Sequence, residues 1–359
     1  AYESSTVAHK FYASGEIPDD ATIQVDLEAV VAAYDDYLDT VEGPGDGPIV
    51  TDFSLAESFD DLVLAVRSRG FYFEPWQVAQ VIVENTDSLS PLVAVQPIYM
   101  HPYSVAKKLS TFAYLYGRKL WINMVAGGFK NDLLALNDST PHDDRYLRLS
   151  EYTLIIRKLL ESEDPVTFEG KYYSVENLSL KQPMPDALFP GITISGSSES
   201  GLKAAADIGA IAIRYPQEPE KEKGIPPQAK TPVGVRIGII ARETKQEAWD
   251  IALERFPEDR KGQLTHQLAM KVSDSEWHKQ LSKKPDSEYP NESPYWLGPF
   301  HNYKTFCPYL VGTHDEVAEL IGGYIGFGFE NFILDIPPSR EELEHTGLVF
   351  AKAKQLAGC

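Results

Sequence analysis

The chain has 359 residues, of which 43% are hydrophobic and 24% are charged, and its formal net charge is -20. This length allows two ordinary domains, but it also suits one α/β barrel with insertions. The negative charge excludes nucleic acids as partners because it repels a phosphate backbone, and the sequence has no run of about 18 apolar residues that could cross a membrane.

The two cysteines, Cys307 and Cys359, are too few for a disulfide framework or a thiolate metal site. The first residues also lack the apolar segment of a signal peptide. We therefore expect a cytoplasmic protein with no metal site.

Residues 1–20 are polar and aperiodic, which predicts a loosely held arm. A first strand is predicted at 21–25, followed by a helix that ends at the glycines and prolines of 43–48. Two short apolar runs come next, 48–53 and 62–66, and the pattern does not decide which of them is the second strand.

The following elements alternate regularly. A helix is predicted over 75–85 and a strand buried on both faces over 91–97. Another helix begins with Ser104 as its N-cap and ends at Gly117.

The segment 119–146 is the centre of the sequence pattern, because it joins a strand, a glycine turn at 126–128 and a long helix. Thr140 is the predicted N-cap of that helix and Pro141 its first residue. In α/β proteins, the turn after such a strand is where ligand-binding groups are placed.

A hydroxyl-rich turn follows the next strand, which is predicted at 191–194 after a small excursion at 168–180. The turn consists of Ser195, Gly196, Ser197 and Ser198. Serine hydroxyls and free backbone N–H groups at a helix start suit a phosphate, although the same motif also serves as an ordinary N-cap.

The remaining predicted strands are 210–214, 233–241 and 331–336. Capping boxes predict helices that start after Thr244, Thr313 and Ser339. Residues 257–311 are polar and much longer than an ordinary connection, so we expect an insertion that acts as a lid or a binding loop.

Strand and helix alternate along nearly the whole chain, which predicts a parallel sheet. Eight strands can be counted with one of the two early runs, and neither a G-x-G-x-x-G motif nor a P-loop occurs. The predicted fold class is therefore α/β, a closed (β/α)8 TIM barrel, with 1–359 as a single domain that carries the insertion at 257–311.

Six segments resemble the bacterial luciferase-like flavin monooxygenases, particularly the alkanesulfonate monooxygenase branch. In family order they are PLVAVQPIYMHPYSVAKKLSTFAYLYGRKLWINMVAGG, PHDDRYLRLSEY, FEGKYYSV, ITISGSSESGLKAAADIGA, VGVRIGIIARETKQEAW and GFGFENFILD. The resemblance covers residues 75–256 and 305–356, whereas the first 74 residues match poorly.

The resemblance implies a TIM barrel that binds reduced FMN at its C-terminal face. A separate NAD(P)H-dependent flavin reductase would supply the reduced FMN, which would react with O2 to give a C4a-(hydro)peroxide that oxidises a small organic substrate. The assembly expected for the family is a homodimer or homotetramer.

The candidate cofactor-binding residues combine this resemblance with the strand ends noted above. They are Gln96, Asn123, Ala126, Tyr146, Ser195, Gly196, Ser197, Ser198 and Arg214. The resemblance would place Gln96 and Asn123 near the flavin ring, and Tyr146 with the serine pair at the phosphate. From the residues alone, Asn123 would be a satisfied interior polar group and Tyr146 a packing residue.

Arg236 matches an active-site arginine of the sulfonate branch, and it is a charged residue within an apolar strand. Such a charge is costly to bury unless the substrate, the flavin or a carboxylate partners it. His101 and His142 are further candidate catalytic residues, as acids or bases near the strand ends.

The sequence departs from the sulfonate branch at three positions. Gly238 stands where those enzymes carry a histidine, Tyr72 where they carry a cysteine and Pro337 where they carry a tyrosine. These departures argue against sulfonate cleavage. Two alternatives to a monooxygenase stay open: a deazaflavin-dependent, hydride-transferring oxidoreductase of the same superfamily, and a non-catalytic flavin-binding barrel.

Overall fold

The computed structural model describes residues 64–66, 74–84, 86, 89–127, 130–180, 183–196, 198–214, 216–217, 231–272, 281–282, 293–335 and 337–357. The predicted arm at 1–20, the strand at 21–25 and the run at 48–53 lie outside these residues.

Parallel strands form one sheet in the order in which they occur along the chain. They are β1 (Leu64–Val66), β2 (Pro91–Val95), β3 (Trp121–Met124), β6 (Gly191–Ser195), β7 (Ile211–Arg214), β8 (Val233–Arg242) and β11 (Phe329–Leu334). This is the strand order of a (β/α)8 barrel. β1 lies within the second of the two early apolar runs, so that run is the strand beside β2.

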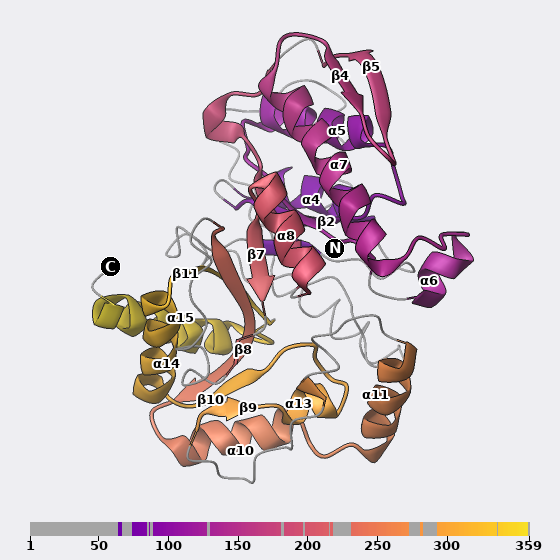
Figure 1. Cartoon of the computed structure of the whole chain (residues 1–359). Helices are drawn as coiled ribbons and strands as arrows, with labels where there is room; N and C mark the ends of the chain where they lie inside the picture. The colour runs from indigo at the N-terminus through magenta and orange to yellow at the C-terminus, as the bar shows by residue number, and fades with distance from the viewer. Residues whose placement is uncertain are drawn as a thin grey trace, which may run out of the picture.

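Helices cover the outside of these strands, as Figure 1 shows for α7 and α8 and for α14 and α15. They are α4 (Pro75–Glu84), α5 (Pro102–Tyr116), α7 (His142–Glu161), α8 (Glu199–Ile208), α10 (Lys245–Arg255), α14 (His314–Gly326) and α15 (Arg340–Ala357). In the described part of the chain, no helix is both long enough and apolar enough to span a membrane.

Alternate residues of the strands separate the outer core from the barrel interior. In β3, Ile122 and Met124 belong to the core formed with α5 and α7. Asn123 and Trp121 therefore face the interior. A Cβ atom on Gly191, the partner of Trp121 in the sheet, would lie 2.1 Å from the indole ring, so glycine lets this ring fill the start of the interior.

The start of α5 differs from the prediction. The helix begins at Pro102, and His101 is its N-cap, because the Nδ1 atom of His101 accepts a hydrogen bond from the Tyr103 N–H at 3.1 Å. Ser104 is therefore not the cap. The predicted end at Gly117 is confirmed, since Gly117 has a left-handed backbone with φ of 62°.

The start of α7 also differs, by one residue. The helix begins at His142, and its N-cap is Pro141, which makes no side-chain capping bond. Thr140 instead donates its backbone N–H and its hydroxyl to the Asp138 carboxylate. This local turn takes the threonine hydroxyl away from the helix, so the predicted cap is wrong.

Three features add to the predicted barrel. The excursion is an antiparallel hairpin of β4 (Val166–Glu169) and β5 (Ser174–Leu178), as expected. A short helix, α6 (Lys130–Ala135), follows the glycine turn and was not predicted. A 3-10 turn, η1 (Asp186–Leu188), precedes β6.

The described part of the insertion contains helices and strands. It contains α11 (Arg260–Val272), β9 (Tyr295–Trp296) and α13 (Gly298–His301), and it ends in the strand β10 (Tyr309–Thr313). β10 pairs in parallel with the second half of β8, whereas β7 pairs with the first half. The last residues of the insertion are thus part of the main sheet.

The three predicted capping boxes all lie at helix starts. Thr244 and Thr313 are the N-caps of α10 and α14, and the Ser339 hydroxyl accepts the Glu342 N–H at the start of α15. At Thr313 the reciprocal bond from Glu316 is also present.

Candidate active site

A group of polar side chains faces the interior where β3 and β6 end. The Asn123 carboxamide oxygen accepts hydrogen bonds from the Thr193 and Ser195 hydroxyls, each at 3.0 Å. Thr193 is the sheet partner of Asn123, and Ser195 follows on the same face. The Asn123 amide N–H groups have no protein partner in the described part of the chain, so they remain available to a ligand.

Gln96 and Ala126 lie just after the ends of β2 and β3, and Ala126 belongs to the outer core. Ala94 is the sheet partner of Asn123, and Gln96 continues its face just beyond the end of β2. Ala126 is buried in the turn after β3. The strand register therefore places Gln96, Asn123 and Ser195 at the same end of the barrel interior.

Tyr146 and Gly196 are in contact where α7 and α8 begin. A Cβ atom on Gly196 would lie 2.5 Å from the Tyr146 hydroxyl oxygen, and one on Gly201 would lie 3.2 Å from the Tyr146 ring. Side chains at these positions would close the space next to the phenol. The two glycines thus leave backbone N–H groups and a phenol hydroxyl together at a helix start, which suits a phosphate.

Ser198 is the N-cap of α8. Its buried hydroxyl oxygen accepts the Gly201 N–H at 3.1 Å, which confirms the N-cap interpretation of the serine turn. A hydroxyl that accepts one bond still has its own proton to donate to an anion. Ser197 lies outside the described residues.

Asp143 ties the starts of α7 and α8 together. Its carboxylate accepts the Ser200 hydroxyl at 2.6 Å and lies 2.9 Å from the Nδ1 atom of His142. The hydrogen bond from Ser200 and, to a smaller extent, that from His142 lower the pKa of Asp143. The His142 ring in turn packs edge-on against Tyr146 at 5.2 Å between ring centres. His142 is therefore positioned beside the candidate phosphate site.

A second polar group lies on the inner face of β8. Val235 and Ile237 pack outward into the core formed with α14 and α15, so Arg236 faces the interior. The Nη2 atom of Arg236 lies 3.2 Å from the Oδ1 atom of Asp335, and their side chains are 8% and 16% exposed. A carboxylate partner therefore compensates the charge that the sequence places in an apolar strand.

Tyr309 completes this group from β10. Its hydroxyl donates to the Oδ2 atom of Asp335 at 2.9 Å. Burial, followed by the charge of Asp335, raises the pKa of Tyr309 well above its usual value, so the hydroxyl stays protonated. A Cβ atom on Gly238 would lie 2.3 Å from the Tyr309 ring, so this ring fills the space that a side chain at position 238 would need.

The β4–β5 hairpin fixes the loop that follows β2. The buried Glu151 carboxylate of α7 accepts the backbone N–H groups of Lys171, Tyr172 and Tyr173 at 2.8, 2.7 and 3.1 Å. The Tyr173 hydroxyl donates to the Pro97 carbonyl at 3.1 Å. Glu151 thus holds the hairpin, and the hairpin holds the backbone beside Gln96.

Two predicted residues, Arg214 and His101, belong neither to these polar groups nor to the candidate phosphate site. Arg214 is the sheet partner of Val235, which places it on the outer face, with its guanidinium 5.8 Å from the centre of the Phe329 ring. His101 is exposed, and its Nδ1 atom is used as the cap of α5. Tyr72 lies outside the described residues.

Asp335 and Tyr309 are the residues that sequence reasoning missed. An acid directly after a largely apolar strand, as in the run from 331 to 335, was a signal that could have identified Asp335. Tyr309 gave no such signal, because it lies in a segment that was interpreted as insertion. Its contact with Asp335 depends on the pairing of β10 with β8.

Comparison with known proteins identifies the family of the chain. The family model described as luciferase-like monooxygenase matches residues 56–331. The chain is 33% identical over 342 residues to BtrO of Niallia circulans, a monooxygenase named for the 4-(gamma-L-glutamylamino)butanoyl group on the BtrI acyl-carrier protein. That alignment covers 89% of this chain and 97% of the relative.

Solved structures of other monooxygenases have the same fold. The long-chain alkane monooxygenase LadA is 21% identical, with a TM-score of 0.61 over 80% of this chain and 74% of that chain. The EDTA monooxygenase EmoA of a Chelativorans species is 16% identical, with a TM-score of 0.62 over 84% and 85% of the two chains. These neighbours confirm the TIM-barrel fold class, and the family match over more than half of the sequence shows that the chain belongs to the luciferase-like monooxygenase family.

Proposed function

We propose that this chain is the oxygenase component of a two-component monooxygenase, which uses reduced FMN and O2 to oxidise a small organic substrate. The observation that carries the proposal is the adjacency of two sites at one end of the barrel. One is the candidate phosphate site at Tyr146 and Gly196, and the other is the hydrogen-bonding group around Asn123.

The residues present fit FMN. The phosphate would bind the Tyr146 hydroxyl, the Ser198 hydroxyl and the backbone N–H groups around Gly196, where the missing Cβ atom leaves room. The Asn123 N–H groups and Gln96 would hydrogen-bond the polar edge of the ring system. When bound, reduced FMN supplies the activation of O2, which no side chain could provide.

The chain itself would bind the substrate, orient it and exclude water. Arg236, Asp335 and Tyr309 form a second polar group on the inner face of β8 and β11, and the end of the insertion contributes Tyr309 to it through β10. A site that excludes water protects a reactive intermediate. His142, beside Tyr146, is the candidate for holding or moving a proton near the cofactor.

The partners follow from the chemistry. The sequence has no G-x-G-x-x-G motif for a nicotinamide cofactor, so we propose that a separate NAD(P)H-dependent flavin reductase supplies reduced FMN. We also propose a homodimer or homotetramer. The relative BtrO is named for an acyl group on a carrier protein, which supports an acyl thioester of a carrier protein as the substrate class here.

The test is reconstituted turnover with an added flavin reductase, NADH, FMN and a panel of acyl thioesters and free acids under labelled O2. The proposal predicts a product that carries one labelled oxygen atom and depends on the acyl group supplied. A Gly196→Ala variant should lose turnover at limiting FMN. A panel that yields only hydrogen peroxide, with no oxygenated product from any acyl group, would contradict the proposal.

A further inference from the structure

We propose that Glu151 and Tyr173 are positioning residues of the candidate flavin site, which hold Gln96 at a fixed place relative to Tyr146. The inference rests on the proposed function in one respect, that Gln96 and Tyr146 contact the ring and the phosphate of FMN. It goes further by assigning a task to the β4–β5 hairpin, which lies beside α7 (Figure 1).

The first step is the attachment of the hairpin turn to α7. Three successive backbone N–H groups, those of residues 171–173, donate to the buried Glu151 carboxylate at 2.8, 2.7 and 3.1 Å, and both carboxylate oxygens are used. Successive N–H groups of a turn form a concave site for an anion. A Cβ atom on Gly170 would lie 2.6 Å from the carboxylate, so the glycine lets Glu151 enter the turn.

The second step is that the turn closes without Glu151. The Gly170 N–H donates to the Tyr173 carbonyl oxygen at 2.9 Å, and β4 pairs with β5. The carboxylate therefore adds a tie to the helix. A further tie is the Lys171 ammonium, 3.0 Å from the Asp144 carboxylate, but these side chains are 56% and 37% exposed, and exposed ion pairs contribute little. Glu151 is thus the stronger of these two ties.

The third step is that Tyr173 contacts both ends of the loop at 96–101. Its hydroxyl donates to the carbonyl oxygen of Pro97, the residue after Gln96, at 3.1 Å. Its ring lies edge-on to the His101 ring, with 6.2 Å between the ring centres. The Tyr152 ring of α7 also packs edge-on against Tyr173, at 5.5 Å. The helix therefore fixes the tyrosine, and the tyrosine fixes the loop.

The consequence is that α7 positions both ends of the candidate flavin site. Tyr146 lies near the start of this helix, and Glu151 follows five residues later, about 7.5 Å along the helix axis. Through Glu151 and Tyr173, the same helix also determines where Gln96 lies. A ligand that contacts Gln96 and Tyr146 together binds more tightly when their spacing is fixed in advance.

The experiment measures reduced FMN binding and amide hydrogen exchange in the purified full chain. Tyr173→Phe removes the bond to Pro97 but keeps the ring. It should weaken reduced FMN about fivefold, the size of one lost hydrogen bond. It should also speed exchange at Tyr99, Tyr103 and Ser104, whose N–H groups donate to the ends of the loop.

Glu151→Gln tests the other end of the chain of contacts. The variant replaces one acceptor oxygen by an amide N–H₂ group, which cannot accept a bond from the turn. It should weaken reduced FMN and speed exchange in the same direction as Tyr173→Phe. Because a buried group is changed, this variant can fail to fold, whereas Tyr173→Phe at a half-buried ring keeps the test available.

A double-mutant cycle separates positioning from a merely structural role. If Tyr173 acts through Gln96, Tyr173→Phe should weaken reduced FMN by less than about twofold in a Gln96→Ala background. A general loosening of the barrel would act equally in both backgrounds. Tyr114→Phe is the matched control, because its exposed tyrosine hydroxyl also donates to a proline carbonyl, that of Pro183. It should change neither affinity nor exchange.

The outcomes are distinguishable. An unchanged affinity for reduced FMN in Tyr173→Phe would overturn the inference, and so would an equal loss with and without Gln96. Failure of the proposed function would look different, because the wild type itself would bind no reduced flavin. The assignment to a flavin site would then fail with it, and the exchange rates alone would decide whether the hairpin holds the loop.

Discussion

The Tyr309 hydroxyl and the Asp335 carboxylate are joined by a hydrogen bond of 2.9 Å that links the end of the insertion to the last strand of the barrel. Asp335 directly follows β11, and Tyr309 begins β10. The bond is partly buried, and it lies on the same inner face as Arg236. The hydrogen bond between Tyr309 and Asp335 thus fixes the end of the insertion to the residue that follows β11.

Gly238 should tolerate no side chain, because the Tyr309 ring lies where a Cβ atom would be. We expect Gly238→Ala to lower the free energy of unfolding by about 1–3 kcal/mol through overpacking. Urea denaturation measures this change. Gly323→Ala is the control, since a Cβ atom in that helix meets nothing within 4 Å, and it should be neutral or stabilising. Equal stability of both variants would show that Tyr309 does not fill this space.

Gly196→Ala should weaken the binding of reduced FMN at least about tenfold, a loss of about 1.4 kcal/mol. The new methyl group would lie 2.5 Å from the Tyr146 hydroxyl and displace it from the phosphate. Reduced riboflavin, which lacks the phosphate, is the control ligand and should bind both proteins alike. An equal loss for both flavins would place the phosphate elsewhere.

Asn123→Ala should give the opposite pattern and weaken reduced FMN and reduced riboflavin by similar factors, because it removes contacts to the ring rather than to the phosphate. The variant should also be less stable by about 1–3 kcal/mol, since the Thr193 and Ser195 hydroxyls lose their shared acceptor. Anaerobic flavin titrations and urea denaturation measure the two effects. Unchanged riboflavin binding would remove Asn123 from the ring site.

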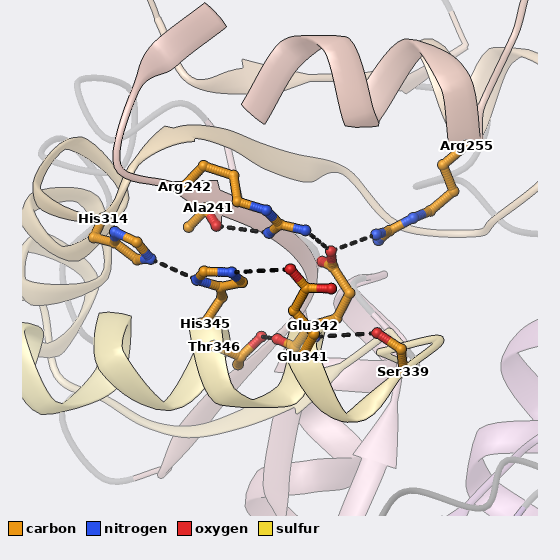
Figure 2. A network of polar contacts seen from close by, with 9 residues as sticks. All are labelled: Ala241, Arg242, Arg255, His314, Ser339, Glu341, Glu342, His345 and Thr346. Carbon is orange, nitrogen blue, oxygen red and sulfur yellow. Dashed lines mark hydrogen bonds and ion pairs between the residues drawn. The ribbon is translucent and has the colours of Figure 1, made fainter. Parts of the chain in front are cut away.

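Glu342→Gln should be strongly destabilising, by about 3–5 kcal/mol. Figure 2 shows the Glu342 carboxylate between Arg242 and Arg255, and next to it the paired rings of His314 and His345. Burial alone would raise the pKa of Glu342, but the two arginines lower it. Neutralising it would leave both guanidinium groups uncompensated. Asp207→Asn, which removes an exposed pair with Lys203, should change stability by less than about 1 kcal/mol.

Asp138 should make stability depend on acid pH. Burial alone would raise its pKa, but hydrogen bonds from Arg148 and Thr140 lower it from 3.8 to about 2. Its contribution is therefore present above pH 3.8 and is lost as the pH falls toward 2. Asp138→Asn should lower the free energy of unfolding by only about 1 kcal/mol at pH 6, because solvent partly screens the pair with Arg148. The loss should be smaller at pH 3, because much of the contribution of Asp138 is already absent in the wild type at that pH. A cost that did not fall with pH would contradict this assignment.

Sequence periodicity predicted the barrel because alternating strands and helices follow directly from local patterns. The strand that starts at Pro91, the cap at Thr313 and the end of α5 at Gly117 each depend on a few neighbouring residues. Each is found, although the strand ends at Val95, two residues before its predicted end. The predicted cap at Thr140 failed for a local reason as well. A competing carboxylate at Asp138 binds its hydroxyl.

Half of the candidate site was accessible from the sequence and half was not. Asn123, Tyr146 and the serine turn lie at strand ends and helix starts, where the fold itself places ligand groups. Tyr309 reaches the site only through the pairing of β10 with the far half of β8, a contact between distant segments that no local pattern encodes. The role of Gly238 likewise becomes visible only with the tyrosine ring in place.

The most direct test of the account is an anaerobic titration of the purified protein with reduced FMN, oxidised FMN and reduced deazaflavin, followed by admission of air while the absorbance is recorded. The account predicts tightest binding of reduced FMN and, after air, a transient absorbance unlike that of either free flavin state, which Gly196→Ala should diminish. Selective binding of the deazaflavin would instead indicate hydride transfer. Failure to bind any flavin would contradict the central claim that this barrel is an FMN-dependent monooxygenase.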